Sequence, residues 1–397
     1  MRSHYGDTLR IAFFTDTYLP SRDGVVTSIL LTKREMERMG HEVFVFAPEP
    51  ARGDPREEGV HYFPSIGFRR YQGYRIPMLP TDNIPILSEL KVDVIHAHGL
   101  FFMGLRSMLA GRGLGLPVVV TFHTMVMDAA KFYNFTPLPD ETASRLLWIY
   151  VKRLLQRAEV VISPTEAIKK ELNALAPKIR RVEVIPTGIE EGRFNPRLDG
   201  SKVRKKLGLE DKKVILHVGR IAKEKNLDLV LQGFALLHME RPDTVLMIVG
   251  EGPAKNEYLK KAKEMKIDGS TIFTGFVSDD ELPLYYAACD VFTLASKFET
   301  QGIVILEAMA TGKPVTGINY RAVAEIIRDG KNGYLFEEDP KSWKAAVQSA
   351  LNAPLEIKQE AVKRAASFST KEGSERLIEI YNFAIRSKAA RVRGKLH

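Results

Sequence analysis

Two glutamates bracket a short apolar segment in the second half of the chain. Glu299 and Glu307 are separated by seven residues, and the positions from Gly302 to Ala310 are almost all apolar. An ionised carboxylate on an apolar helix is costly unless it meets a partner, so Glu307 is expected to bind a polar group. The alternative is a solvent-facing Glu307 with Glu299 as a helix cap. Gly302 lets the backbone come close to a ligand at the helix start, where free amide groups favour a phosphate.

A second cluster combines cations with a glycine. The segment His217–Asn226 (HVGRIAKEKN) follows an expected strand and leads into an expected helix, and Arg220 and Lys225 supply fixed positive charge there. Prepositioned cations stabilise the negative charge that develops on a departing diphosphate. Taken alone, the segment is equally compatible with an exposed basic turn.

Short apolar runs alternate with helical stretches along most of the chain. Strands are expected at 9–14, 42–47, 92–96, 117–122 and 160–163, and helices at 24–39, 100–110 and 143–158. After a turn-rich stretch at 186–199 the pattern restarts, with strands at 214–219, 244–249, 271–274, 291–294 and 314–317 and helices at 227–238, 255–266, 282–289, 302–310 and 322–328. This alternation predicts an α/β protein with parallel sheets and crossover helices.

A chain of 397 residues exceeds the size at which a single core usually stops growing. We therefore expect two domains, 1–187 and 188–397. The last helix, at about 372–386, is a candidate to return to the first domain.

Together these stretches resemble the retaining glycosyltransferases of family four, which have the GT-B fold. The family's markers are the glutamate pair, here Glu299 and Glu307, and a G-R-x-x-x-x-K segment, here Gly219, Arg220 and Lys225. The resemblance covers essentially the whole chain, and three further segments match it: 185–189 (IPTGI), 250–253 (GEGP) and 290–292 (DVF). It implies two Rossmann-like domains that face each other across a cleft and bind a nucleotide diphosphate sugar as donor.

The resemblance also implies roles for individual residues. Arg220 and Lys225 would hold the diphosphate. Glu307 would bind the ribose hydroxyls of the nucleotide, and Glu299 would lie near the hydroxyls of the transferred sugar. His123 would contact that sugar from the N-terminal domain.

Further donor contacts follow from the same resemblance. Gly24 belongs to the family's glycine pair near the donor phosphates, and Asp23 replaces the first glycine of that pair. Gly302, Ile303 and the backbone around Val277 would complete the donor site. The base leaves no trace in the sequence, so a UDP-hexose and a GDP-hexose both fit.

Retention of anomeric configuration, by front-side displacement with the leaving phosphate as base, is likewise implied by the resemblance. Nothing identifies a carboxylate nucleophile of the kind that retaining hydrolases use. We expect no cofactor and no metal. His96 and His98 form an H-x-H pair, but without a spaced third ligand a structural role is favoured.

The acceptor is expected on the N-terminal domain. Two segments there, 63–79 and 144–157, mix basic, aromatic and aliphatic residues and contain no acid. Such a composition is typical of an interfacial segment; the alternative for the second is a core helix with ordinary surface cations. Arg75 and Asp128 are candidate acceptor-binding residues, because their surroundings resemble the diacylglycerol glucosyltransferases of the family, although 126–132 departs from that pattern. We expect hexose transfer to a lipid, with a soluble-acceptor glycosyltransferase or a sugar-nucleotide epimerase as alternatives.

The net charge of +9 favours an anionic partner, and the tail at 386–397 adds five Lys or Arg without an acid. No nucleic-acid-binding motif is recognisable, so an anionic membrane surface is the expected partner and nucleic acid is not. The sequence has no secretory signal, no apolar run of about 18 residues, and one cysteine, Cys289, which suits a reducing compartment. These features predict a cytoplasmic protein, attached peripherally to the cytoplasmic face of the membrane.

Overall fold

The computed structural model describes residues 8–67, 75–78, 84–123, 139–190 and 192–393, and its contacts divide the chain into two units. Unit 1 comprises Met1–Gly188 and Thr370–His397, and unit 2 comprises Ile189–Ser369. The last helix, α15 (Thr370–Arg393), is longer than the predicted 372–386 and belongs to unit 1. Unit 2 therefore ends at Ser369 instead of extending to the end of the chain.

Unit 1 is built on a seven-stranded sheet with the order β3-β2-β1-β6-β7-β8-β9, in which all neighbours are parallel. The strands are β1 (Arg10–Phe14), β2 (Glu42–Pro48), β3 (Val60–Phe63), β6 (Val94–Ala97), β7 (Val118–Thr121), β8 (Val160–Ser163) and β9 (Val182–Val184). A separate antiparallel pair joins β4 (Ser65–Gly67) to β5 (Arg75–Pro77).

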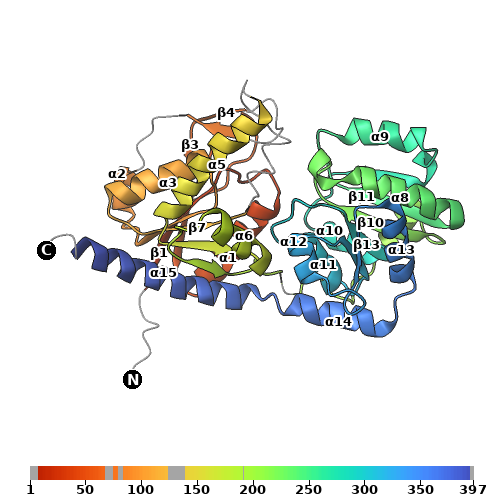
Figure 1. The fold of residues 1–397 in the computed structure, drawn as a ribbon. Helices are drawn as coiled ribbons and strands as arrows, with labels where there is room; N and C mark the ends of the chain where they lie inside the picture. The colour runs from red at the N-terminus through yellow and green to blue at the C-terminus, as the bar shows by residue number, and fades with distance from the viewer. Residues whose placement is uncertain (1–7, 68–74, 79–83, 124–138, 191, 394–397) are drawn as a thin grey trace. The chain divides into compact units, whose positions relative to one another are not determined.

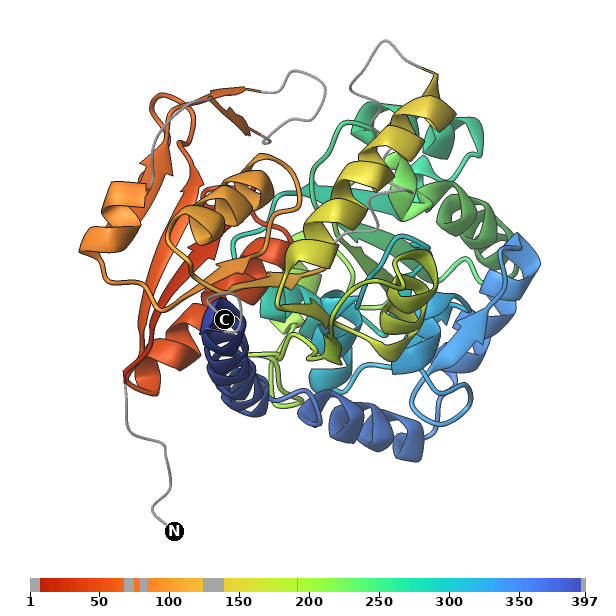
Figure 2. The same cartoon turned by 60° about the vertical axis from the view of Figure 1, so that its left-hand side comes forward.

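Helices cover both faces of this sheet (Figure 1). They are α1 (Gly24–Arg38), α2 (Ile84–Glu89), α3 (Phe102–Gly113), α5 (Asp140–Arg157), α6 (Glu166–Leu175) and α15. Alternate side chains of β1 and β6, including Ile11 and Val94, pack with Tyr381 of α15 in one core. On the other face of the sheet, Gly111 of α3 leaves room for Val118 of β7, whose Cγ2 would lie only 2.4 Å from a Cβ at this position. Figure 2 shows α15, in dark blue, from a second direction.

Unit 2 repeats this architecture with a six-stranded parallel sheet of order β12-β11-β10-β13-β14-β15. Its strands are β10 (Lys213–Val218), β11 (Thr244–Val249), β12 (Thr271–Gly275), β13 (Val291–Leu294), β14 (Val315–Ile318) and β15 (Tyr334–Phe336). Its α-helices are α7 (Ser201–Leu207), α8 (Leu227–Glu240), α9 (Lys255–Glu264), α10 (Leu282–Ala288), α11 (Ile303–Ala310), α12 (Arg321–Ile326), α13 (Pro340–Leu351) and α14 (Leu355–Ala366).

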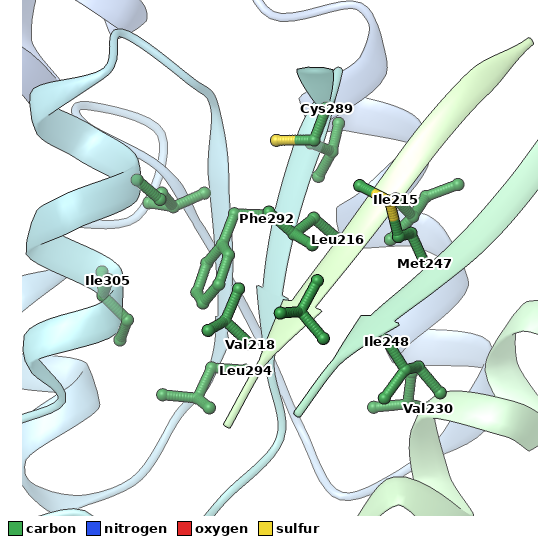
Figure 3. Close-up of a cluster of buried hydrophobic side chains, with 14 of the residues drawn as sticks. Ile215, Leu216, Val218, Val230, Met247, Ile248, Cys289, Phe292, Leu294 and Ile305 are labelled. Atoms are coloured by element: carbon green, nitrogen blue, oxygen red, sulfur yellow. The ribbon is translucent and has the colours of Figure 1, made fainter. Parts of the chain in front are cut away.

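The core of unit 2 lies between its strands and its helices. Figure 3 shows side chains of β10, β11 and β13 packed with Val230 of α8 and Ile305 of α11. The strands are apolar at almost every position because both faces of the sheet are covered. Helices α8 and α13 pack closely because Gly233 presents no side chain to the ring of Trp343, where a Cβ would lie only 2.5 Å away. The predicted α/β class with two parallel sheets is confirmed.

Candidate active site

The strand order of each sheet indicates the point at which a ligand is expected to bind. In unit 2, β10 and β13 are neighbours although β11 and β12 lie between them in the sequence. At such a point the connections leave in opposite directions, and open α/β sheets bind ligands beyond the carboxyl ends of these strands. Segments 219–226 and 295–302 follow β10 and β13, so they hold the predicted residues Arg220, Lys225 and Glu299.

These two segments meet in an ion pair. Lys225 ends the short 3₁₀ helix η1 (Lys223–Lys225), and its Nζ donates to Oε1 of Glu299 at 2.6 Å. The two side chains keep only 21% and 16% of their exposure, respectively. Burial opposes both charges, but their mutual attraction outweighs it, so the pKa of Glu299 lies below its usual 4.5 and that of Lys225 above its usual 10.5. Both groups are therefore charged at neutral pH.

Arg220 adds a second cation beside this pair. It follows Gly219 at the end of β10, and its charge slightly opposes the raised pKa of the Lys225 ammonium. Glu299 and the buried Glu224 of η1 balance these two cations, so Arg220 and Lys225 are the cationic donors of a segment without net excess charge. A guanidinium and an ammonium group close together can still donate charge-assisted hydrogen bonds to an anionic ligand such as a diphosphate.

Glycines bring three strand ends close together at the same place. Gly219 has φ 152° and Gly250 has φ 138°, and a Cβ on Gly250 would lie 2.0 Å from the carbonyl oxygen of Gly219. The amide of Gly250 also donates to the carbonyl of Gly275 at 2.9 Å. Val277, predicted to contact the donor through its backbone, lies just after Gly275 with its side chain buried. A side chain on Gly250 would force the strand ends apart.

Glu307 is buried, so the solvent-facing alternative is wrong. Helix α11 leaves it 9% exposed, and its Oε2 accepts a hydrogen bond from the hydroxyl of Tyr286 in α10 at 2.7 Å. Burial raises the pKa of Glu307 above its usual 4.5, while the Tyr286 bond and the charge of Arg193 oppose this rise. The carboxyl group is thus held by the hydroxyl of Tyr286.

The start of α11 lies between the two glutamates. Gly302 has φ 88° at the N-cap position and Ile303 is the first helical residue. Because glycine has no side chain, this position provides no capping oxygen for the first amides of the helix.

In unit 1, three histidines lie together at the carboxyl ends of β6 and β7. Nδ1 of His98 and Nε2 of His123 are 3.0 Å apart, and the rings of His98 and His96 are tilted by 37° with centroids 4.1 Å apart. His96 bonds to Tyr381 and Thr121 through both ring nitrogens, which supports the structural role predicted for it. Burial lowers the pKa of His123 to about 4, so the ring is neutral at pH 7.

A small cavity adjoins this histidine cluster. It has a volume of about 30 Å³ and is lined by polar groups that include His98, Thr187, Thr370 and Ser374. Nε2 of His98 is buried and lacks a hydrogen-bond partner among the described residues. The volume suffices for about one water molecule.

Asp16 is a buried acid that was not among the site residues predicted from the sequence. It follows β1, is 6% exposed, and accepts hydrogen bonds from the amides of Phe101 and Met103, both at 2.9 Å. Burial raises the pKa of Asp16 to about 6, although the hydrogen bonds from these amides lower it. Asp16 thereby ties the end of β1 to the start of α3 and positions the segment that carries His98. The available signal was an acid placed directly after a buried strand.

The predicted phosphate loop begins α1. Gly24 is the first helical residue, and the carboxylate of Asp23 accepts from the amide of Val26 at 2.8 Å. The aspartate that replaces the family's first glycine therefore serves as a helix cap.

Of the acceptor candidates, Arg75 is described and Asp128 lies outside the described residues. The guanidinium of Arg75 donates to the hydroxyl and the carbonyl of Ser65, both at 2.8 Å, so part of its donor capacity holds β5 to β4. Within the described ranges, no cluster of three metal-ligating side chains occurs and no helix is long and apolar enough to span a membrane.

Comparisons with known proteins identify the family. The model of Glycosyltransferase Family 4 matches residues 22–193, and that of Glycosyl transferases group 1 matches residues 199–368. An alpha-monoglucosyldiacylglycerol synthase from Streptococcus pneumoniae is 31% identical over 95% of this chain and 86% of its own length. The chain is a family-four glycosyltransferase.

Two further relatives of this glycosyltransferase are named for the same activity and for a different one. A second alpha-monoglucosyldiacylglycerol synthase, from Acholeplasma laidlawii, is 29% identical over 87% of the chain and 89% of its own length. A GDP-mannose-dependent alpha-mannosyltransferase from Corynebacterium glutamicum is 31% identical over 83% of this chain and 77% of its own length.

A solved structure confirms the GT-B fold. Anabaena HepE in complex with UDP-glucose has a TM-score of 0.76, with 19% identity over 94% of this chain and 99% of its own. At this level of identity the likeness concerns the fold alone.

Proposed function

We propose that this glycosyltransferase moves a hexose from a nucleoside diphosphate hexose to a hydroxyl of a membrane glycerolipid, with retention of anomeric configuration. The observation that carries the proposal is the Lys225–Glu299 ion pair with Arg220 at the switch point of unit 2. Glu307 and the start of α11 contribute polar groups from the same unit.

The chemistry follows from the charge of this site. As the bond between the anomeric carbon and the phosphate oxygen breaks, negative charge accumulates on the diphosphate. Arg220 and Lys225 are already in place to stabilise it, at little cost of reorganisation. The departing phosphate oxygen takes the proton of the acceptor hydroxyl, whose oxygen bonds to the anomeric carbon from the same side. Glu299 orients Lys225 and accepts hydrogen bonds from the sugar hydroxyls.

The donor is proposed to be UDP-glucose, with a GDP-hexose as the competing choice. Two relatives are named as alpha-monoglucosyldiacylglycerol synthases, which supports glucose and a glycerolipid. The GDP-mannose-dependent relative supports the competing donor.

A surface stripe on α5 supports the lipid acceptor. One side of this helix packs in the interior through Val151, Leu154 and Leu155. The opposite side exposes two apolar residues and three cations: Arg145, Leu146, Ile149, Arg153 and Arg157. Leu146 is 53% and Ile149 38% exposed. The helix thus combines the two alternatives from the sequence, because one face is core and the other has the composition of an interfacial surface.

The reaction is tested by incubating the enzyme with UDP-glucose, UDP-galactose, GDP-mannose and GDP-glucose, each with diacylglycerol vesicles and without lipid. Mass analysis should reveal a hexosyl diacylglycerol and free nucleoside diphosphate in the lipid arm only. Transfer to a soluble sugar or metabolite instead would refute the lipid acceptor. An altered sugar nucleotide without any acceptor would favour an epimerase.

Membrane attachment is tested by flotation of the full chain with vesicles that contain anionic lipid. Each basic residue near such a surface contributes about 1 kcal/mol, so a few suffice for reversible binding. Release is expected at high salt, since the screening length falls to about 3 Å at 1 M. Replacing Leu146 and Ile149 by Ser, or Arg145 and Arg153 by Gln, should reduce flotation severalfold.

The basic tail supplies the matched control. Arg386 and Arg393 are exposed on α15, and their replacement by Gln should leave flotation unchanged. Truncation is a poorer control because Arg391 pairs with the buried Glu159. Loss of flotation in the tail variant, with retention in the α5 variants, would assign binding to the tail and remove the support from α5.

A further inference from the structure

One buried group beside the proposed diphosphate site has no assigned task. His217 lies near the end of β10 with its side chain fully buried. Its Nδ1 is 3.3 Å from the carbonyl oxygen of Thr293 in β13. A carbonyl oxygen only accepts hydrogen bonds, so Nδ1 carries the proton of the neutral ring and Nε2 carries a lone pair.

That lone pair is unused. Nε2 of His217 is buried and has no hydrogen-bond partner in the described part of the chain. It points toward the segment after β10, since a Cβ on Gly219 would lie 3.7 Å from it. Nε2 of His217 therefore lies next to Gly219, the residue that precedes Arg220.

The surroundings of the ring set its charge. Lys225 on η1 repels a proton on His217, and Glu299 after β13 attracts one. Glu224 and Arg220 act on the same Lys225. The neighbouring strand β11 (TVLMIV) contributes no titratable side chain. Burial and the Lys225 charge together lower the pKa of His217 to about 4, so the ring is neutral in the free protein at pH 7.

We propose that His217 is part of the donor site and that its Nε2 takes up one proton from solvent when a nucleoside diphosphate hexose binds at Arg220 and Lys225. This inference rests on the proposed function. Arg220 and Lys225 are balanced by Glu224 and Glu299 in the free protein, so the two negative charges of the diphosphate shift the local balance in favour of a protonated ring. The imidazolium keeps its bond to Thr293 and presents Nε2–H toward the ligand, which adds a third positive charge under the diphosphate.

The size of the effect follows from the two states. A nearby opposite charge raises the pKa of a cationic group by about 1–3. A rise from about 4 to about 6 predicts uptake of about half a proton per UDP-glucose bound at pH 6 and almost none at pH 7.5. By the same linkage, binding is about fourfold tighter at pH 5.5 than at pH 7.5.

Proton uptake is measured by isothermal titration calorimetry of the full chain with UDP-glucose, at about pH 6 and pH 7.5, in buffers of different ionisation enthalpy. Both phosphates of UDP-glucose are esterified, so the ligand itself does not titrate in this range. The uptake should disappear in His217→Gln and in His217→Phe, which preserves the volume of a ring.

His238→Gln is the matched control. His238 lies in the same unit, and both of its ring nitrogens are hydrogen-bonded, to Thr244 and Ser270. This variant should retain the wild-type uptake. Saturable binding of UDP-glucose without uptake at pH 6, or uptake that persists in both His217 variants, overturns the inference and leaves the proposed function standing. If the wild type binds neither UDP-glucose nor GDP-mannose, the donor site itself is refuted, and the inference with it.

Discussion

Breaking the Lys225–Glu299 pair from either side should destabilise unit 2 more than removing both charges together. The perturbations are Lys225→Met, Glu299→Gln and the double variant. At 2.6 Å and an effective dielectric constant of about 20, the gross attraction is about 6 kcal/mol. Desolvation of two largely buried ions offsets most of it, so the net value of the pair is small.

The single variants differ because each leaves a charge without its partner. Removing one member of a fully buried pair costs about 3–5 kcal/mol. Since the side chains of Lys225 and Glu299 remain 21% and 16% exposed, we expect about 2–3 kcal/mol for each single variant. The double variant should lose only about 1–2 kcal/mol, so the coupling energy is about 3 kcal/mol.

The pair's contribution should also depend on pH in a defined way. The pKa of Glu299 is lowered, so its contribution is present above 4.5 and is lost as the pH falls through the folded value. The pKa of Lys225 is raised, so its contribution is present below 10.5 and is lost as the pH rises through the folded value. Between these limits the coupling should be constant.

The assay uses the positions of the two tryptophans, Trp148 in unit 1 and Trp343 in unit 2. In a Trp148→Phe background, fluorescence during urea unfolding reports on unit 2 alone, which avoids the mixed transition of a two-domain chain. Single-variant losses that add within about 0.5 kcal/mol in the double variant would refute this reasoning, because the two groups would then act independently.

Three further predictions concern catalysis. Arg220→Ala should lower turnover about a hundredfold or more through lost charge stabilisation, while Arg241→Ala, on the surface of the same unit, should leave it unchanged; near-normal turnover in folded Arg220→Ala would remove this residue from the diphosphate site. Glu307→Ala should raise KM more than it lowers kcat, since its contacts exist before reaction, and Tyr286→Phe should act in the same direction but less; calorimetry with unchanged UDP-glucose affinity in Glu307→Ala would contradict the ribose role. EDTA should leave activity intact if the cations replace a metal, and activity that is lost and then restored by Mg²⁺ or Mn²⁺ would overturn metal independence.

Much of the fold could be predicted because its strands are covered on both faces. Runs such as 245–249 in β11 are apolar throughout, and the helices between them show a different period. The three-residue strands β9 and β15 and the four-residue β3 were not predicted, because so few residues do not display a period. The antiparallel β4–β5 pair was also not predicted.

The candidate site was predicted as residue types but not as contacts. Lys225 and Glu299 were both singled out, yet their hydrogen bond joins residues 74 positions apart. Tyr286, the partner of Glu307, carried no signal in the sequence, because a tyrosine on an apolar helix looks like any core aromatic. His217 and Asp16 were overlooked for a related reason: each lies at or after a buried strand, where only its neighbours decide whether its polar atoms are used.

The sequence by itself determined the class of the protein, through the alternation of strand and helix periods and the spacing of the glutamates and cations. Only the tertiary structure decided the charge and the partner of each side chain. Strand order placed the ends of β10 and β13 together, and this proximity makes Lys225 and Glu299 an ion pair. Burial and charge–charge interaction depend on distances through space, so residues far apart in the chain set the protonation of Glu307, His123 and His217.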